Sequence, residues 1–206
     1  MNPQPVTLNG PFVRLVPLTL EHVPALARVG LDPALWHWVP TPVTTADEMR
    51  TYVACALDDQ AHGLALPFAI VDTASLEVIG CTRYANIDVK NRRLEIGWTW
   101  LARSHQRTAA NTNAKRLLLG HAFDELGAIR VELKTDALNA KSRAAIGRIG
   151  AVQEGIVRKH SITASGRVRD AVYFSIIDTE WPAVRRTLDA RLAQGAAATT
   201  VTSTQV

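Results

Sequence analysis

The 206-residue chain has little cysteine, and it lacks any long apolar run. Its two cysteines, Cys55 and Cys81, stand outside any CxxC pair or cysteine–histidine cluster. We therefore expect reduced thiols, although the spacing leaves a disulfide open. No apolar run approaches the roughly 20 residues of a membrane-spanning helix. Residues 1–10 have neither the basic nor the apolar region of a secretory signal, so we expect a cytoplasmic protein with no membrane partner.

Several functional motifs are also missing. The six histidines never occur in HxxxH or HExxH spacing, so we assign no metal. The GxxxxGK[ST] and GxGxxG loops are absent, which argues against a mononucleotide phosphate-binding domain. The net charge is only +4, and the lysines and arginines are dispersed along the chain. This distribution suits an anionic small ligand and gives no sign of nucleic-acid binding.

What is present is the composition of one ordinary globular domain, with 47% hydrophobic and 20% charged residues. We expect an irregular lead-in over residues 1–10 and a single domain over residues 11–194. Residues 195–206 have no apolar face, which predicts a disordered tail.

Hydrophobic periodicity and capping signals predict an α+β domain. Strands are expected at residues 12–18, 66–71, 76–88, 94–100, 129–134, 152–162 and 168–177. Helices are expected at residues 19–29, 45–58, 111–126, 140–149 and 180–192, with Gly30 as the C-cap of the first. This order predicts a central mixed, mostly antiparallel twisted sheet flanked by helices.

The most informative segment is LEIGWTWLARSHQRTAAN, residues 94–111. It reads as an alternating strand, a loop of small residues and the start of an amphipathic helix. Such a turn directs backbone N–H groups and the positive end of a helix dipole to one point, which a diphosphate suits best. The alternative for this segment alone is an ordinary loop before a helix.

With these residues placed, the chain resembles the GNAT superfamily of acetyltransferases, and in particular its RimJ/RimL-type branch, over about residues 12–192. The family's pyrophosphate loop, Q/R-x-x-G-x-G/A, matches QRTAAN at residues 106–111. The segment VELKTDALNAKSRAAIGRIGA, residues 131–151, resembles the strand–Asn–helix segment beside the pantetheine arm. Residues 154–158 and 169–173 resemble the C-terminal hairpin of the branch. The resemblance implies a GNAT-like fold with acetyl-CoA as co-substrate.

The resemblance also implies a set of cofactor-binding residues. Backbone groups of one strand would meet the pantetheine amides, and a bulge near Gly97 would splay that strand from its neighbour. The set is Trp98, Thr99, Trp100, Leu101, Gln106, Arg107, Thr108, Ala109, Ala110, Asn111, Asn139 and Ser142. The side chains of Trp98 and Trp100 are expected to pack in the core. Ala109 and Asn111 replace the loop glycines, but both keep the N–H donor.

Two residues are candidates for catalysis. Glu95 is the candidate general base, because an ammonium acceptor must lose a proton before it attacks. Ser142 is the candidate acid toward the departing thiolate, since the tyrosine of many GNAT enzymes would align with Ile146. The alternatives are helix capping, for Ser142 and for Asn139, and a structural ion pair of Glu95 with Arg92, Arg93 or Arg130.

Trp36, Trp38 and Tyr173 are candidates for acceptor binding. The first two stand between prolines in the loop over residues 35–43, where this fold shapes the acceptor pocket. The alternative for that loop is a hydrophobic plug over the sheet, and Tyr173 could simply pack. Lys141, in the helix after Asn139, could reach the 3′-phosphate of the cofactor or belong to a solvated face.

The resemblance implies an enzyme that moves an acetyl group from acetyl-CoA to a primary amine by direct attack in a ternary complex. Strand N–H groups would polarise the carbonyl, and no covalent enzyme intermediate is expected. The acceptor would be a protein N-terminus or a small-molecule amine. A non-catalytic acyl-CoA sensor or scaffold is the alternative. A homodimer is left open.

Overall fold

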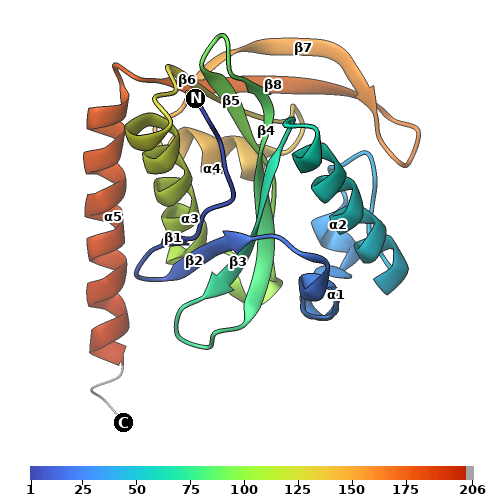
Figure 1. The fold of residues 1–206 in the computed structure, drawn as a ribbon, viewed down its shortest axis with the longest axis horizontal. Coiled ribbons are helices and arrows are strands. Elements are labelled where there is room, and N and C mark those ends of the chain that lie inside the picture. Colours follow the sequence, from blue (N-terminus) through green and yellow to red (C-terminus); the bar gives the residue numbers. More distant parts are fainter. Residues whose placement is uncertain (203–206) are drawn as a thin grey trace.

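The computed structural model describes the backbone of residues 1–202 and the side chains of residues 1–195. Its eight strands form one sheet in the order β1-β2-β3-β4-β5-β6-β8-β7 (Figure 1). The strands are β1 (Leu8–Asn9), β2 (Val13–Pro17), β3 (Leu66–Asp72), β4 (Val78–Asp88), β5 (Arg93–Leu101), β6 (Arg130–Asp136), β7 (Val152–Ile162) and β8 (Val168–Ile177). The α-helices are α1 (Val23–Gly30), α2 (Ala46–Ala61), α3 (Ala109–Gly120), α4 (Ala140–Arg148) and α5 (Trp181–Thr202).

All neighbouring strands are antiparallel except β5 and β6, so the predicted mixed, mostly antiparallel sheet is confirmed. Helices cover both faces of the sheet (Figure 1). Buried side chains from α3, α4 and α5 join one hydrophobic cluster with the sheet. Side chains from α1 and α2 join a second, smaller cluster around Trp36, Met49 and Trp100.

The parallel pair β5–β6 is short and splayed. The two strands pair only at Arg93–Arg130, Leu94–Val131 and Glu95–Glu132. Strand β5 then continues to Leu101, whereas the rest of β6 pairs with β8. Trp98 lies at the point of divergence with a φ of 49°, a left-handed conformation that breaks the strand's alternation. The expected bulge near Gly97 is therefore at Trp98, and the β5 edge beyond Glu95 is open toward β6.

Several elements differ from their sequence predictions. The first helix is split into a 3₁₀ turn, Leu20–His22, and α1, and Gly30 belongs to α1 instead of capping it. The lead-in contributes the short strand β1. Helix α5 continues past the expected end at Leu192 to Thr202 because its later residues include an alanine run with high helix propensity. The rest of the expected disordered tail, residues 203–206, lies outside the described residues.

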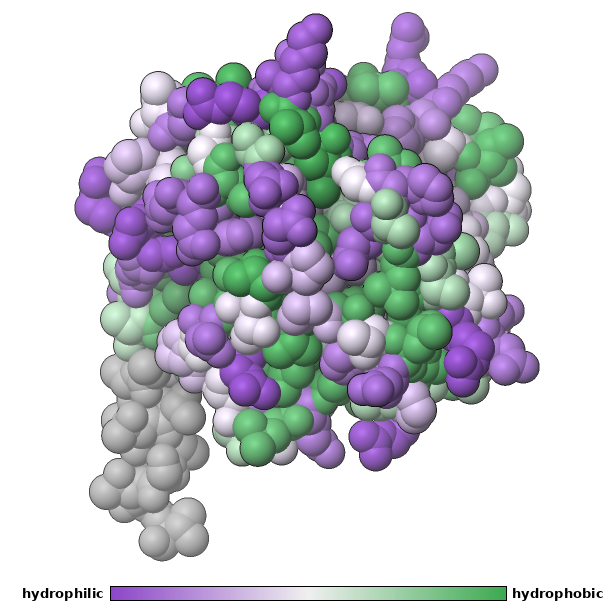
Figure 2. Space-filling model, viewed as in Figure 1, coloured by the Kyte–Doolittle hydropathy of each residue, from purple (hydrophilic) through white to green (hydrophobic). Residues whose placement is uncertain are grey.

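The capping box predicted at the start of the second helix is present. Thr45 accepts a hydrogen bond from the Glu48 N–H at 3.2 Å, and the Glu48 carboxylate accepts one from the Thr45 N–H at 3.0 Å. Within the described residues no helix has the length and hydropathy needed to cross a membrane. Hydrophilic and hydrophobic residues are interspersed on the side of the molecule seen in Figure 2.

Candidate active site

The start of α3 forms the expected turn from a loop into a helix. Thr108 is the N-cap, and its Oγ1 accepts a hydrogen bond from the Ala110 N–H at 3.2 Å and donates one to the His105 carbonyl at 2.8 Å. Arg107 precedes it with a φ of 64°. Ala109 and Asn111 belong to the helix and need no left-handed backbone, so the absence of glycine there does not obstruct the turn. The first N–H groups of α3 have no intrahelical acceptor and face outward along the helix axis.

A cavity of about 250 Å³ lies beside this turn. Gln106 connects two parts of the chain beside this cavity. Its Nε2 donates a hydrogen bond to the Leu101 carbonyl at 3.1 Å, and its Oε1 accepts one from Lys141 Nζ at 2.7 Å. The other charged residues of the lining are Arg103, Arg107 and Asp32. Three cations against one carboxylate make this cavity suited to an anion.

Asn139 is the N-cap of α4, which is the alternative to cofactor binding that we gave for it from the sequence. Its Oδ1 accepts a hydrogen bond from the Ser142 N–H at 3.0 Å. Ser142 is thus the third helical residue and not the cap, and its side chain is half-buried. Ile146 is buried in the core, so no hydroxyl occupies the position of the tyrosine found in many relatives.

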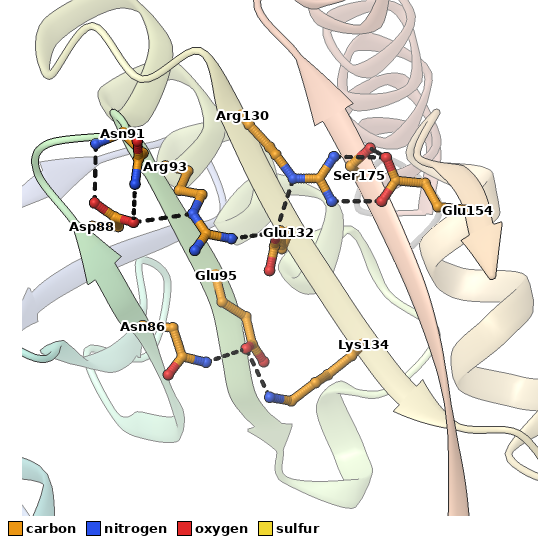
Figure 3. A network of polar contacts seen from close by, with 10 residues as sticks. All are labelled: Asn86, Asp88, Asn91, Arg93, Glu95, Arg130, Glu132, Lys134, Glu154 and Ser175. Atoms are coloured by element: carbon orange, nitrogen blue, oxygen red, sulfur yellow. Dashed lines mark hydrogen bonds and ion pairs between the residues drawn. The ribbon is translucent and has the colours of Figure 1, made fainter. Parts of the chain in front are cut away.

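Glu95 lies on β5 at the last paired position before the splay. It is only 2% exposed. Its Oε2 accepts a hydrogen bond from Asn86 Nδ2 at 2.7 Å and forms an ion pair with Lys134 Nζ at 2.9 Å (Figure 3). Lys134 was not singled out from the sequence, where it reads as an outward position of an alternating strand. A buried carboxylate needs such partners, because burying an unpaired charge is expensive.

The arginines that we weighed as partners of Glu95 pair elsewhere. Arg130 forms two hydrogen bonds with the Glu154 carboxylate, at 2.6 and 2.5 Å, and a further one with Glu132 at 2.9 Å (Figure 3). The hydrogen bonds from Arg130 lower the pKa of Glu154 to about 2. Arg93 donates to Asp88 at 3.2 Å. This network of contacts connects β6, β7 and β8. The charged partner of Glu95 is therefore Lys134 and not one of these arginines.

Lys115 of α3 is a buried cation beneath the bulge. It is 6% exposed, and its Nζ donates to Thr99 Oγ1 at 2.7 Å. Burial lowers the pKa of Lys115 to about 7, although the charge of Glu95 raises it. Thr99 in turn contacts Thr82 Oγ1 at 2.7 Å. Sequence reasoning missed Lys115, yet its place between the apolar positions Ala114 and Leu118 was a usable signal.

Trp98 is 44% exposed, so the expectation that its side chain packs in the core is wrong. The bulge turns the ring outward, where it covers the Arg83 guanidinium at 5.0 Å and Lys134 Nζ at 5.9 Å from the ring centroid. Tyr173 also covers Lys134, at 5.9 Å, and its hydroxyl lies 3.1 Å from His160 Nε2. Trp98 and Tyr173 therefore share one face of the sheet with Lys134.

The two tryptophans of the 35–43 loop have different surroundings. Trp36 is 5% exposed, donates a hydrogen bond to the Gly30 carbonyl at 2.7 Å, and packs on Tyr52 and Trp100. These contacts match the alternative that we gave for this loop, a hydrophobic plug over the sheet. Trp100 is buried, as expected. Trp38 is half-buried and lies 5.9 Å from the Arg167 guanidinium, so it faces the β7–β8 hairpin. No group of three or more candidate metal ligands occurs among the described residues.

Comparisons with known proteins found a matching family and similar proteins. Residues 13–152 match the family described as Acetyltransferase (GNAT) domain. The chain is 28% identical over 176 residues to the uncharacterized N-acetyltransferase p20 of Bacillus licheniformis, covering 85% of this chain and 98% of that protein.

Solved structures give the same result. A GCN5-related N-acetyltransferase from Brucella melitensis aligns with a TM-score of 0.85 at 33% identity, covering 91% of this chain and 86% of that one. RimJ of Mycobacterium smegmatis, crystallised with CoA-disulfide, aligns with a TM-score of 0.79 at 25% identity, covering 91% and 95%. The family match extends over more than half of the sequence, and the chain therefore belongs to the GNAT family of acetyltransferases.

Proposed function

We propose that this enzyme transfers the acetyl group of acetyl-CoA to a primary amine. The observation that carries the proposal is the splay of β5 from β6, with the N-terminus of α3 directly after β5. An open strand edge offers peptide-like donors and acceptors, and a helix N-terminus offers N–H donors for a diphosphate. The two features follow one another along the chain, as the pantetheine arm and the diphosphate do in coenzyme A.

The residues present fit that co-substrate. Backbone groups of Trp98, Thr99, Trp100 and Leu101 would meet the pantetheine amides, in the part of β5 that β6 does not pair. The turn from Gln106 through Arg107, Thr108, Ala109 and Ala110 to Asn111 would hold the diphosphate, with Arg103 and Lys141 adding positive charge. Asn139 and Ser142 would flank the arm from α4. Bound there, the co-substrate supplies an acetyl thioester.

The chain's own groups would then manage the proton and the developing charge. Glu95 would accept a proton from the acceptor ammonium, directly or through water, so that the neutral amine can attack the thioester carbonyl. Strand N–H groups near Trp98 would stabilise the oxyanion of the tetrahedral intermediate. Collapse of that intermediate breaks the C–S bond, and Ser142 would donate a hydrogen bond or proton to the leaving thiolate. The products are an N-acetyl amine and free coenzyme A.

The acceptor face would be formed by Trp98, Tyr173 and Trp38. Within the class of primary amines, the acceptor would be a protein N-terminus or a small-molecule amine. Trp36 is left out of this face because it is buried. Membership of an acetyltransferase family disfavours the non-catalytic sensor that we weighed from the sequence.

The test is thiol release from acetyl-CoA across a panel of peptides with free N-termini and small amines. We expect amine-dependent release that falls when Ser142 is changed to alanine, and little change when Ser104, in the loop before the turn, is changed to alanine. Binding of coenzyme A without turnover of any amine would contradict the proposal and favour the sensor.

A further inference from the structure

The proposed acceptor face carries polar side-chain atoms that have no hydrogen-bond partner among the described residues. Arg169 of β8 is 8% exposed, and its Nε is buried without a hydrogen-bond acceptor. Its one charge partner is Asp136, with Nε 3.7 Å from Oδ2, which is too long for a hydrogen bond. Among residues 1–195 no acceptor lies within hydrogen-bond distance of the buried Arg169 Nε. A buried guanidinium in this state is costly unless a ligand or water satisfies it.

Two further polar atoms are unsatisfied beside Arg169. His160 Nδ1 and Ser161 Oγ are both buried and without partners in the described structure. Ser161 is the register partner of Arg169 across β7 and β8. Burial lowers the pKa of His160, and the neighbouring charges of Lys134 and Arg169 lower it further. These effects agree with an excess of positive charge around the imidazole.

This group lies on the same face as the candidate base. Side chains alternate along a strand, and register partners share a face, so Arg169 and Tyr173 of β8 lie on the same side as Lys134 of β6. Lys134 contacts Glu95 at 2.9 Å, and the Tyr173 hydroxyl contacts His160 at 3.1 Å. The unsatisfied donors are thus separated from Glu95 by a short chain of side chains in contact.

The carboxylates on this face are already engaged. Glu95 Oε2 accepts a hydrogen bond from Asn86 and is ion-paired with Lys134. Asp136 accepts from the Leu138 N–H at 2.9 Å and pairs with Arg167 as well as Arg169. A second buried arginine, Arg83, is accounted for differently, because its guanidinium stacks on the rings of Tyr52 and Trp98. Within the described residues Arg169 has its ion pair with Asp136 but no such ring contact.

From these contacts we propose that the acceptor amine carries a carboxylate, which Arg169 binds together with His160 and Ser161. The proposal rests on the proposed function and specifies its substrate class. An arginine matches a carboxylate with two parallel hydrogen bonds, and an adjacent hydroxyl and imidazole complete the oxygen's coordination. The carboxylate could be the α-carboxylate of a free amino acid or the side chain of an acidic residue near a peptide N-terminus.

The test compares matched acceptors in the thiol-release assay. One arm uses peptides beginning serine–glutamate and serine–glutamine, and the other uses free serine and serinamide. We expect the charged member of one arm to have a kcat/KM at least about tenfold above its neutral partner, as a charge-assisted hydrogen bond provides. The arm that shows the preference identifies the source of the carboxylate.

Variants then assign the preference to its residue. Arg169→Gln should raise KM for the charged acceptor about tenfold or more, while kcat/KM for the neutral partner changes little. Arg169→Lys keeps the charge and should retain part of the preference, which keeps the test informative if the glutamine variant folds poorly. Arg158→Gln is the matched control, because Arg158 is an exposed arginine of β7.

Two results would overturn the proposal. One is equal or faster transfer to the neutral member of both pairs, and the other is a charged-acceptor preference that survives in Arg169→Gln. Either result leaves the proposed function intact, because transfer to an amine is still observed. Absence of transfer to every amine would instead overturn the proposed function and this inference with it.

Discussion

Replacing Lys115 by methionine tests whether the ammonium buried beneath the bulge titrates near neutral pH. The native pKa of about 7 lies below the ordinary value of 10.5 because burial disfavours the charged form. Between these two values the unfolded chain binds a proton that the native chain has released. The free energy of unfolding must therefore rise with pH through this window, and the rise is absent below about pH 7.

The magnitude follows from the linkage. The full difference between the two pKa values corresponds to about 5 kcal/mol, since one unit is worth about 1.4 kcal/mol. Between pH 7 and pH 9 the native chain loses its remaining half proton or so while the unfolded chain stays largely protonated, and wild type should gain about 2 kcal/mol relative to Lys115→Met. The methionine variant has no such titration, and the other groups that titrate in this range cancel in the difference.

The assay is urea unfolding of both proteins at pH 6, 7, 8 and 9 in one buffer series, with the midpoint and slope fitted at each pH. We expect the two free energies to run parallel from pH 6 to 7 and then to converge or cross as wild type gains stability. Parallel curves across the whole range would refute the argument and would mean that Lys115 keeps its proton inside the fold.

The remaining predictions concern Glu95, Gly97 and Thr45. Glu95→Gln should lower kcat at least about a hundredfold, as loss of a general base does, and should leave the affinity for coenzyme A unchanged. An unchanged kcat in a folded Glu95→Gln variant would show that Glu95 is not the base. Gly97→Ala should lower activity without unfolding the protein, because the added Cβ would lie 2.9 Å from Glu95 Oε1 and displace the carboxylate, and full activity would contradict that geometry. Thr45→Ala should lower the free energy of unfolding by about 1 kcal/mol through loss of the α2 cap, measured by urea unfolding, with the exposed Thr51 changed to alanine as a control.

Much of the fold could be predicted from local patterns, because alternation and capping act over a few residues. Strands β7 and β8 have the bounds that the alternation gave, and the Thr45 capping box marks the start of α2. The exceptions share a cause. Trp98 breaks the alternation of β5 through a bulge, and no local pattern in β5 distinguishes its exposed ring from the buried ring of Trp100.

The site was less predictable than the fold, since its contacts join residues far apart in the sequence. The turn at residues 106–111 could be placed because strand, loop and helix follow one another. The partner of Glu95 could not, because Lys134 reaches it from a different strand across the splay. The unsatisfied group at Arg169 likewise exists only through the register of β7 against β8.

The central claim is that backbone amides at the start of α3 bind the diphosphate of coenzyme A, and calorimetric titration of Ala109→Pro with coenzyme A tests it most directly. Ala109 is the first helical residue, where proline is tolerated, and Thr108 before it is extended, so the substitution removes one N–H and keeps the helix. Ala46→Pro makes the same change at the start of α2 and serves as the control. We predict that Ala109→Pro binds coenzyme A about tenfold to a hundredfold more weakly than wild type, while Ala46→Pro binds like wild type. Equal affinity for all three proteins, or no binding by wild type, would contradict the account.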